Sequence, residues 1–430
     1  MDIPLLEILG QLDILGLLVL ALAGLFMVYL AVTSKVHGLF FFLVLGASLT
    51  GSTVSLFDNL GSIMRWIAAL LLVLSALLLK RINVPLGPLL FLGYVAFGFI
   101  FLFFSNSDNY QFQRGALLIV VAAAVPLAYG NQSWRTFQLS LIGTAIIATA
   151  YSAYNFASLP GHLGDATRLS GYVKGTPWFA MVLGGLLPFS LWGFWNAPSR
   201  GLRLISGTGF LLGTIMLVFS GQRAGTIAGL LGVTPLLLTN LSRRKTMGWA
   251  VLMLIVLSSL GFYFFRQSSG ERMDFLLRRY DRAAGINDRD VIWGEAIAEI
   301  NKNPLLGRGT GGAETFYTIS FHNTWLEVWY NTGLPGLVLF VAAQIYFFRR
   351  IYLLGRSHRD PEARSILALA MGYMLGFLVL CMFESIGAGA SNANIVLYLF
   401  LGVLVSKNDL LGSFAQRGGD SETASEATPA

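Results

Sequence analysis

The sequence predicts an all-α, polytopic integral membrane protein with about 12–13 transmembrane helices and one compact outside loop region that carries short helices. Hydrophobic residues make up 55% of the chain and charged residues 12%, and the mean hydropathy is +0.67, far from soluble-domain averages. Apolar runs near 20 residues recur, each long enough to cross about 30 Å of hydrocarbon. The alternating pattern of an outer-membrane barrel is absent. These observations favour a helical bundle in the membrane.

The expected spans follow directly from these apolar runs. They are residues 14–32, 37–55, 62–79, 86–104, 114–130, 135–156, 177–195, 202–219, 224–241, 247–265, 335–354, 366–386 and 392–406. The first run has no basic region before it and no convincing cleavage site, so it is interpreted as a retained segment. If every run crosses, their number is odd and the N-terminus lies outside.

Basic residues indicate the orientation of the spans. Clusters at Lys80-Arg81, Arg200/Arg203, Arg243–Lys245 and Arg349–Arg359 fall on alternate loops, which the positive-inside rule makes cytoplasmic. The net charge of +7 says little beyond this distribution. The same parity puts three segments outside. They are the 157–176 loop, the 220–223 turn and the 266–334 interval.

Four parts of the chain are therefore expected. They are N-terminal transmembrane helices at 1–265, the outside loop region with the candidate catalytic segment at 266–334, C-terminal transmembrane helices at 335–406, and a cytoplasmic tail at 407–430. The composition of the tail, rich in Gly, Ser, Thr, Glu and Ala, is typical of disorder. Cys381 is the single cysteine, so no disulfide is expected.

One helix is predicted inside the outside interval. Asp288–Asp290 opens it, Trp293, Ile297 and Ile300 line one face, and Asn303-Pro304 ends it. A glycine turn follows at 307–312. Such a turn can hold phosphate on backbone N–H groups, but no strand precedes it and no P-loop lysine or serine follows, so a plain turn is favoured.

The segment 320–336 links this interval to the next span. His322 and Asn323 stand at an expected helix start, and Trp325 and Trp329 recur at helical spacing, which predicts a short amphipathic helix at the membrane surface. Glycine and proline then bend the chain before a span begins. Two interpretations stay open here. His322 either caps the helix, or it is a titratable group held at the rim between water and lipid.

Arginine occurs in four outside settings. Arg168 precedes Lys174 and a span, Arg223 lies in a tight turn between spans, Arg289 begins the loop helix and Arg308 lies in the glycine turn. Each could simply extend to lipid headgroups. If several converge, their planar guanidinium groups would make a phosphate site.

The sequence predicts neither a metal nor another cofactor, because its four histidines are scattered and no Asp-x-Asp motif occurs. Arginines could then neutralise a departing pyrophosphate. His322 is the candidate general base. Glu384, at an outer helix end, is a candidate to orient the imidazole, whereas Glu327 is expected to brace Asn323.

Four motifs in order carry a resemblance to a known family: R-L-x-G before a proline-started span, S-x-x-R-A between two spans, D-R-x-x-x-W-x-x-A followed by N-P-L-L-G-x-G, and H-N-x-x-L-E-x-x-x-x-x-G-x-x-G. Together they resemble the O-antigen ligase/polymerase superfamily over about residues 160–340. The resemblance implies a bacterial inner-membrane enzyme whose site faces the periplasm. Two departures are Gln222, where serine is common, and the odd number of spans.

The resemblance also implies substrates and roles. Arg168, Arg223 and Arg289 match arginines assigned to the donor pyrophosphate, and His322 matches the catalytic histidine. The expected reaction moves glycan from undecaprenyl pyrophosphate to lipid A–core, without a metal, as an O-antigen ligase does. Alternatives are an O-antigen polymerase, a protein O-oligosaccharyltransferase or, from another class, a lipid or solute transporter that uses Glu384 in a proton path. Membrane lipids are expected contacts and nucleic acid is not.

Overall fold

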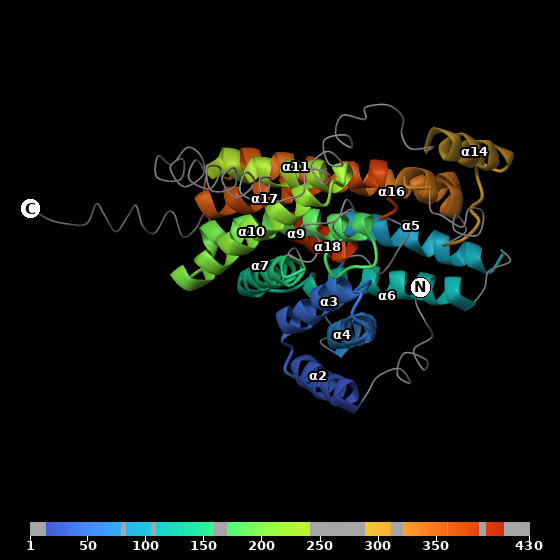
Figure 1. The fold of residues 1–430 in the computed structure, drawn as a ribbon. Coiled ribbons are helices and arrows are strands. Elements are labelled where there is room, and N and C mark those ends of the chain that lie inside the picture. Colours follow the sequence, from blue (N-terminus) through green and yellow to red (C-terminus); the bar gives the residue numbers. More distant parts are fainter. Residues whose placement is uncertain are drawn as a thin grey trace, which may run out of the picture.

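The computed structural model describes residues 14–78, 83–104, 109–158, 170–240, 289–310, 321–358, 360–386 and 393–407. Over these residues the fold is all-α, with no strand beyond an isolated bridge between Ser52 and Val173 (Figure 1). The helices are α2 (Ile14–Val32), α3 (Val36–Leu49), α4 (Ser55–Leu78), α5 (Leu86–Leu102), α6 (Asn109–Tyr129), α7 (Trp134–Phe156), α9 (Thr176–Asn196), α10 (Arg200–Phe219), α11 (Arg223–Asn240), α14 (Arg289–Lys302), α16 (Thr324–Ser357), α17 (Pro361–Phe383) and α18 (Ala393–Ser406).

The prediction of a polytopic helical membrane protein is confirmed. In the described ranges, seven helices are long and apolar enough to cross a membrane, and five shorter apolar helices accompany them. Each expected span except 247–265 overlaps one of these helices, although α16 begins eleven residues before the expected span 335–354. The 247–265 span, the N-terminal residues 1–13 and most of the expected tail lie outside the described residues.

The bundle has a buried centre and a lipid-type rim. Almost every residue of α18 is buried, and this helix packs against α3, α5, α6, α9, α16 and α17. At the edge farthest from α11 and α17 lies α2, where large apolar side chains such as Leu25 stay 70% exposed (Figure 1). Exposed apolar side chains on a multi-pass protein face lipid.

A seam of small residues joins α9, α11 and α17. A Cβ atom on Gly372 of α17 would lie 2.0 Å from the carbonyl oxygen of Gly232 on α11, and one on Gly184 of α9 would lie 2.8 Å from the carbonyl of Gly225. Without side chains at these points the helix backbones touch, as is common in membrane bundles. The seam therefore fixes how α11 lies along α17.

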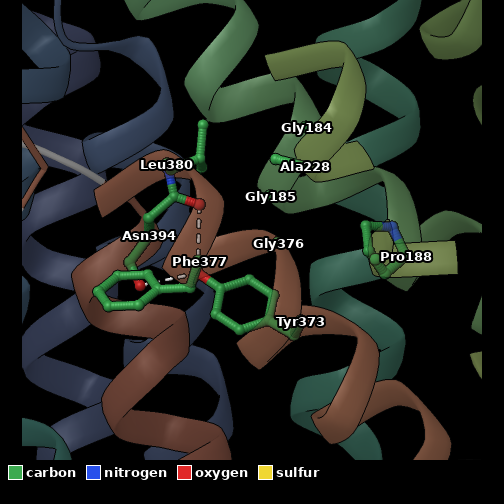
Figure 2. Close-up of a pocket in the computed structure, with 10 residues that line it drawn as sticks. Gly184, Gly185, Pro188, Ala228, Tyr373, Gly376, Phe377, Leu380 and Asn394 are labelled. Atoms are coloured by element: carbon green, nitrogen blue, oxygen red, sulfur yellow. Dashed lines mark hydrogen bonds between the residues drawn. The ribbon is translucent and has the colours of Figure 1, made fainter. Parts of the chain in front are cut away.

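A polar junction closes the same region. Figure 2 shows Asn394, at the start of α18, beside Tyr373 of α17. The Tyr373 hydroxyl donates to the Asn394 carbonyl at 2.8 Å, and the Asn394 amide donates to the Met181 carbonyl of α9 at 3.0 Å. These bonds satisfy buried polar groups that lipid could not, and they tie α18 to the seam.

The predicted surface helix and the following span form one helix, α16, with a kink. Gly333 has φ +65°, and a Cβ atom there would lie 2.2 Å from the Leu305 carbonyl oxygen, so only glycine fits. Pro335 follows in the next turn. Trp325 is partly buried, and its ring packs edge-on to Phe340 of the same helix, with 5.2 Å between the ring centroids.

The predicted loop helix is present as α14, but its buried face differs from the prediction. Ala296 and Ile300 are buried against Phe321 and Tyr330, whereas Ile297 is 41% exposed. The small Ala296 allows α14 to approach α16 closely, which rotates Ile297 away from the contact.

The described part of the glycine turn binds backbone rather than an anion. The N–H groups of Arg308, Gly309 and Thr310 donate to the carbonyls of Tyr330, Asn331 and Gly98 at 2.9–3.0 Å. They satisfy carbonyls of α16 next to its kink and one carbonyl of α5. The interpretation as a plain turn agrees with these bonds.

Candidate functional site

A buried carboxylate lies where four distant parts of the chain meet. Glu384, the residue that ends α17, is 1% exposed. Its Oε1 atom accepts a hydrogen bond from Gln222 Nε2 at 2.6 Å and lies 3.6 Å from Arg289 Nη2. Its Oε2 atom lies 3.2 Å from His322 Nδ1. We call Gln222, Arg289, His322 and Glu384 the Glu384 cluster.

The hydroxyl group of Thr324 holds the backbone around Glu384 in place. The Thr324 hydroxyl donates to the Glu384 carbonyl at 2.7 Å and accepts from the Ile386 N–H at 3.0 Å. One residue at the start of α16 therefore fixes both sides of Glu384. Thr324 follows His322 by two positions. The hydrogen bonds of Thr324 therefore position both the imidazole and the carboxylate.

Of the expected supporting residues, Asn323 stands at the helix start as predicted, whereas Glu327 has other partners. Asn323 caps α16, accepting from the Leu326 N–H at 3.1 Å. Glu327 does not brace Asn323. It accepts instead from the Phe321 N–H at 3.2 Å and from the Ser385 hydroxyl, because it points back toward the end of α17. Glu327 thus stabilises the chain on both sides of the Glu384 cluster.

His322 has an unusual backbone. Its φ of +50° lies in the left-handed region, which non-glycine residues seldom adopt. Such conformations persist where surrounding contacts over-determine them, and they concentrate at functional sites. Here the contacts of Thr324 and Glu327 impose the turn just before the cap. The result is an imidazole directed at Glu384 and still 28% exposed.

The carboxylate also selects a tautomer. With Nδ1–H donating to Glu384, a neutral imidazole has its lone pair on Nε2. That nitrogen is then the proton acceptor of the ring. A carboxylate on the other nitrogen also stabilises the imidazolium once a proton has been accepted.

Positive charge gathers on the same side of the cluster. Arg223 and Arg289 are the first residues of α11 and α14, and α16 starts two positions after His322. Gln222, adjacent to Arg223, brings the start of α11 to Glu384. Three helix amino ends therefore converge here, each with a partial positive charge. An anion would be stabilised beside this cluster.

Two of the predicted site residues lie elsewhere. Lys174 pairs with Asp58 and its side chain is 59% exposed. Arg308 donates to Glu299 at 3.0 Å on the outer surface of α14, where Lys302 binds the same carboxylate. Arg168 lies outside the described residues.

Sequence reasoning gave Gln222 no role. The one indication in the sequence is that Gln222 directly precedes Arg223 in a turn between two spans. The contact itself depends on the length of the Gln222 side chain, which reaches Glu384. Within the described part of the chain, no three His, Cys, Asp or Glu side chains gather in a way that could hold a metal ion.

Comparison with known proteins agrees with the motifs. Residues 208–341 match the family model for O-antigen ligase. This match supports a relationship to the O-antigen ligase family over the matched region. The matched region contains Gln222, Arg223, Arg289 and His322, but Glu384 follows it. The match therefore relates this part of the chain to the ligases and polymerases of polysaccharide assembly.

Two individual proteins are similar over much of the chain. The exopolysaccharide production protein ExoQ of Rhizobium meliloti (strain 1021) is 22% identical over 311 residues, covering 66% of this chain and 69% of ExoQ. A chain in the solved structure "Structural coordination of polymerization and crosslinking by a peptidoglycan synthase complex" is 19% identical, with a TM-score of 0.38, covering 74% of this chain and 97% of that one.

Proposed function

We propose that this protein is an inverting, metal-independent glycosyltransferase of the bacterial inner membrane, with its site facing the periplasm. It moves O-antigen glycan from undecaprenyl pyrophosphate to lipid A–core. The observation that carries the proposal is the Glu384 cluster, in which a carboxylate-bound imidazole stands beside Arg289 and the amino ends of α11, α14 and α16. Such a group offers one base and one anion site, which are the two requirements of this transfer.

In the proposed reaction His322 acts on the acceptor. The acceptor sugar hydroxyl attacks the anomeric carbon of the donor, and its proton passes to Nε2 of His322. The new C–O bond forms as the bond from the anomeric carbon to the pyrophosphate oxygen breaks. Attack opposite the leaving group inverts the anomeric centre. Glu384 stabilises the imidazolium that results.

The leaving group takes the electron pair of the broken bond. Its negative charge is met by Arg223, Arg289 and the helix amino ends, and Arg168 is expected to join them. A pyrophosphate neutralised in this way departs without a general acid. Before the donor arrives, Arg289 lies within ion-pair distance of Glu384 at 3.6 Å. The donor phosphate would then share this guanidinium with the carboxylate.

The test is a reconstituted transfer. Purified protein in proteoliposomes is given lipid-linked glycan and lipid A–core, and glycosylated acceptor is measured in the presence and absence of EDTA. Arg289→Lys and Arg223→Lys keep the charge but lose the planar fork, so both should slow transfer. His358, which pairs with the Leu354 carbonyl at 3.0 Å, supplies the control His358→Ala.

Three outcomes would overturn parts of the proposal. Normal rates in both lysine variants would remove the phosphate role of the arginines. Loss of activity in EDTA that Mg²⁺ restores would make the reaction metal-dependent. Movement of intact donor across the bilayer with no covalent product would favour the transporter.

A second candidate is polymerisation of glycan repeat units. ExoQ, the relative found in the comparison, is described as a protein of exopolysaccharide production. In a polymerase the acceptor is another lipid-linked glycan and no lipid A–core is needed. Donor alone in the same proteoliposomes separates the two: longer lipid-linked chains indicate a polymerase, and an unchanged donor indicates a ligase.

A further inference from the structure

Two adjacent leucines stand exposed just after α14. Leu305 is 58% exposed and Leu306 is 56% exposed, and Leu334, at the kink of α16, is 40% exposed beside them. We call Leu305, Leu306 and Leu334 the leucine patch. The sequence places the first two within an interval expected outside the membrane, where exposed leucine pairs would contact water at a cost.

The leucine patch is firmly joined to the kink of α16. The Pro304 carbonyl accepts from the Leu334 N–H at 3.0 Å and from Trp329 Nε1 at 3.0 Å. The Leu305 carbonyl lies against Gly333, where a Cβ atom would meet it at 2.2 Å. Leu305 and Leu306 therefore stand at the same depth as the kink.

The patch continues a lipid-facing stripe of α16. Val338, Ile345 and Tyr352 are 56%, 61% and 57% exposed, and with Leu334 they recur on one face of the helix. The opposite face of α16 is buried in the bundle. Because this chain is a multi-pass membrane protein, the exposed apolar face of α16 contacts lipid.

Helix length sets the depth of the patch. At the other end of the stripe, exposed Arg349 marks the membrane boundary, since arginine avoids the hydrocarbon. Leu334 precedes Arg349 by 15 residues (349 − 334), a rise of about 22 Å. The hydrocarbon is about 30 Å thick, so Leu334 lies within it. Tilt of α16 shortens the projected rise and places Leu334 deeper still.

We infer that the leucine patch inserts into the acyl chains of the leaflet on the side of the Glu384 cluster. Lys302 and Arg308, with side chains 68% and 48% exposed, flank it and fit the level of the phosphate headgroups. The carboxyl end of α14 is then held by lipid and its amino end by Arg289 at Glu384. A helix expected to lie wholly outside the membrane would thus be anchored in it.

Fluorescence in liposomes tests this inference without relying on activity. Leu305→Cys and Leu306→Cys are labelled with an environment-sensitive fluorophore in the full-length protein, where native Cys381 is buried. Quenching by nitroxide on lipid acyl chains is compared with quenching by aqueous iodide. Val338→Cys is the control for lipid contact, and Glu295→Cys, on the exposed face of α14, is the control for water. The wild-type protein, treated with the same fluorophore, gives the background from labelling at sites other than the introduced cysteine.

We expect both leucine positions to match Val338, with several-fold weaker iodide quenching than at Glu295. Strong iodide quenching with no acyl-chain quenching would overturn the inference. Protection from both quenchers would also overturn it, because a protein surface would then cover the patch.

A second variant checks that the leucines themselves insert. Leu306→Asp in the Leu305→Cys protein should lower acyl-chain quenching of the label, whereas Leu306→Ile should leave it unchanged, since only the aspartate resists transfer into hydrocarbon. Equal quenching in the two variants would contradict insertion. These readouts are independent of glycan transfer, so either proposal can fail alone.

Discussion

Two of the contacts between the α11 and α17 segments differ in chemistry, since one is made by backbone and the other by polar side chains. At the seam, Gly232 and Gly372 bring backbone to backbone. At the membrane edge, Gln222 and Glu384 meet through long polar side chains at 2.6 Å. The seam brings helix backbones together at glycines, while the cluster holds a partly exposed imidazole and two helix starts that carry guanidinium groups. The glycine contact sets the relative position of the two helices. That position in turn allows Gln222 to reach Glu384.

This difference separates two kinds of substitution. Changes in the seam should act on folding, because helix backbones touch there and an added side chain would force them apart. Changes in the Glu384 cluster should act on the rate of glycan transfer. Replacing its residues by others of similar size preserves the packing but removes the reacting or charged group. Variants that mix the two effects would show that the seam and the cluster are not separable.

The largest effect is expected from the seam. Gly372→Leu places a Cβ atom 2.0 Å from the Gly232 carbonyl, so α11 and α17 must separate. Overpacking typically costs about 1–3 kcal/mol, and a backbone contact this short should reach or exceed that range. Thermal unfolding in detergent measures it. Gly355→Leu is the matched control on α16, since nothing lies within 4 Å of that position.

In the Glu384 cluster the largest effect belongs to His322. His322→Ala should lower turnover by about 10²–10⁴, the usual worth of general-base catalysis, with unfolding temperature and donor binding unchanged. If donor binding collapses in His322→Ala instead, His322 is a ligand of the donor and not the base.

Sequence reasoning recovered the helices but not the way their ends meet. Apolar runs and basic loops were enough to find each described span, because lipid imposes length and composition. Arg289 and His322 were recognised through local motifs. Gln222, by contrast, meets Glu384 across 162 residues, and no local pattern specifies that contact. The exposure of Ile297 was missed for the same reason, since the packing partner of α14 decides it.

Glu384→Gln should have the next largest effect. The amide keeps the size of the side chain but removes the charge that would stabilise the imidazolium and attract Arg289. Partners that orient a reacting group are typically worth about 10–100-fold in activity. Single-turnover transfer measures this loss. A fall in unfolding temperature as large as that of Gly372→Leu would instead make Glu384 a structural residue.

A smaller loss is expected from Gln222→Leu. Removing one hydrogen bond to a charged acceptor costs about 1.5–3 kcal/mol, and some of it should appear in the site rather than in the fold. Glu384 Oε1 would turn to Arg289, now 3.6 Å away, and draw the guanidinium from the donor. We therefore expect weaker donor binding with a smaller change in maximal rate. Unchanged donor binding would show that Gln222 has no influence on Arg289.

The smallest effect should come from Arg308, although the sequence grouped it with the site arginines. Its partner is Glu299 of α14, and because the Arg308 side chain is 48% exposed, the pair should contribute under about 1 kcal/mol. Hydrogen bonding from Lys302 and the charges of Lys302 and Arg308 lower the pKa of Glu299. The stabilisation this adds is present at neutral pH and is lost as pH falls through the lowered pKa.

Arg308→Ala should therefore leave transfer unchanged at neutral pH and reduce the unfolding temperature only slightly, with the difference vanishing in acid. A loss of transfer comparable to that of Arg289→Lys would place Arg308 at the donor phosphate and extend the site along the glycine turn.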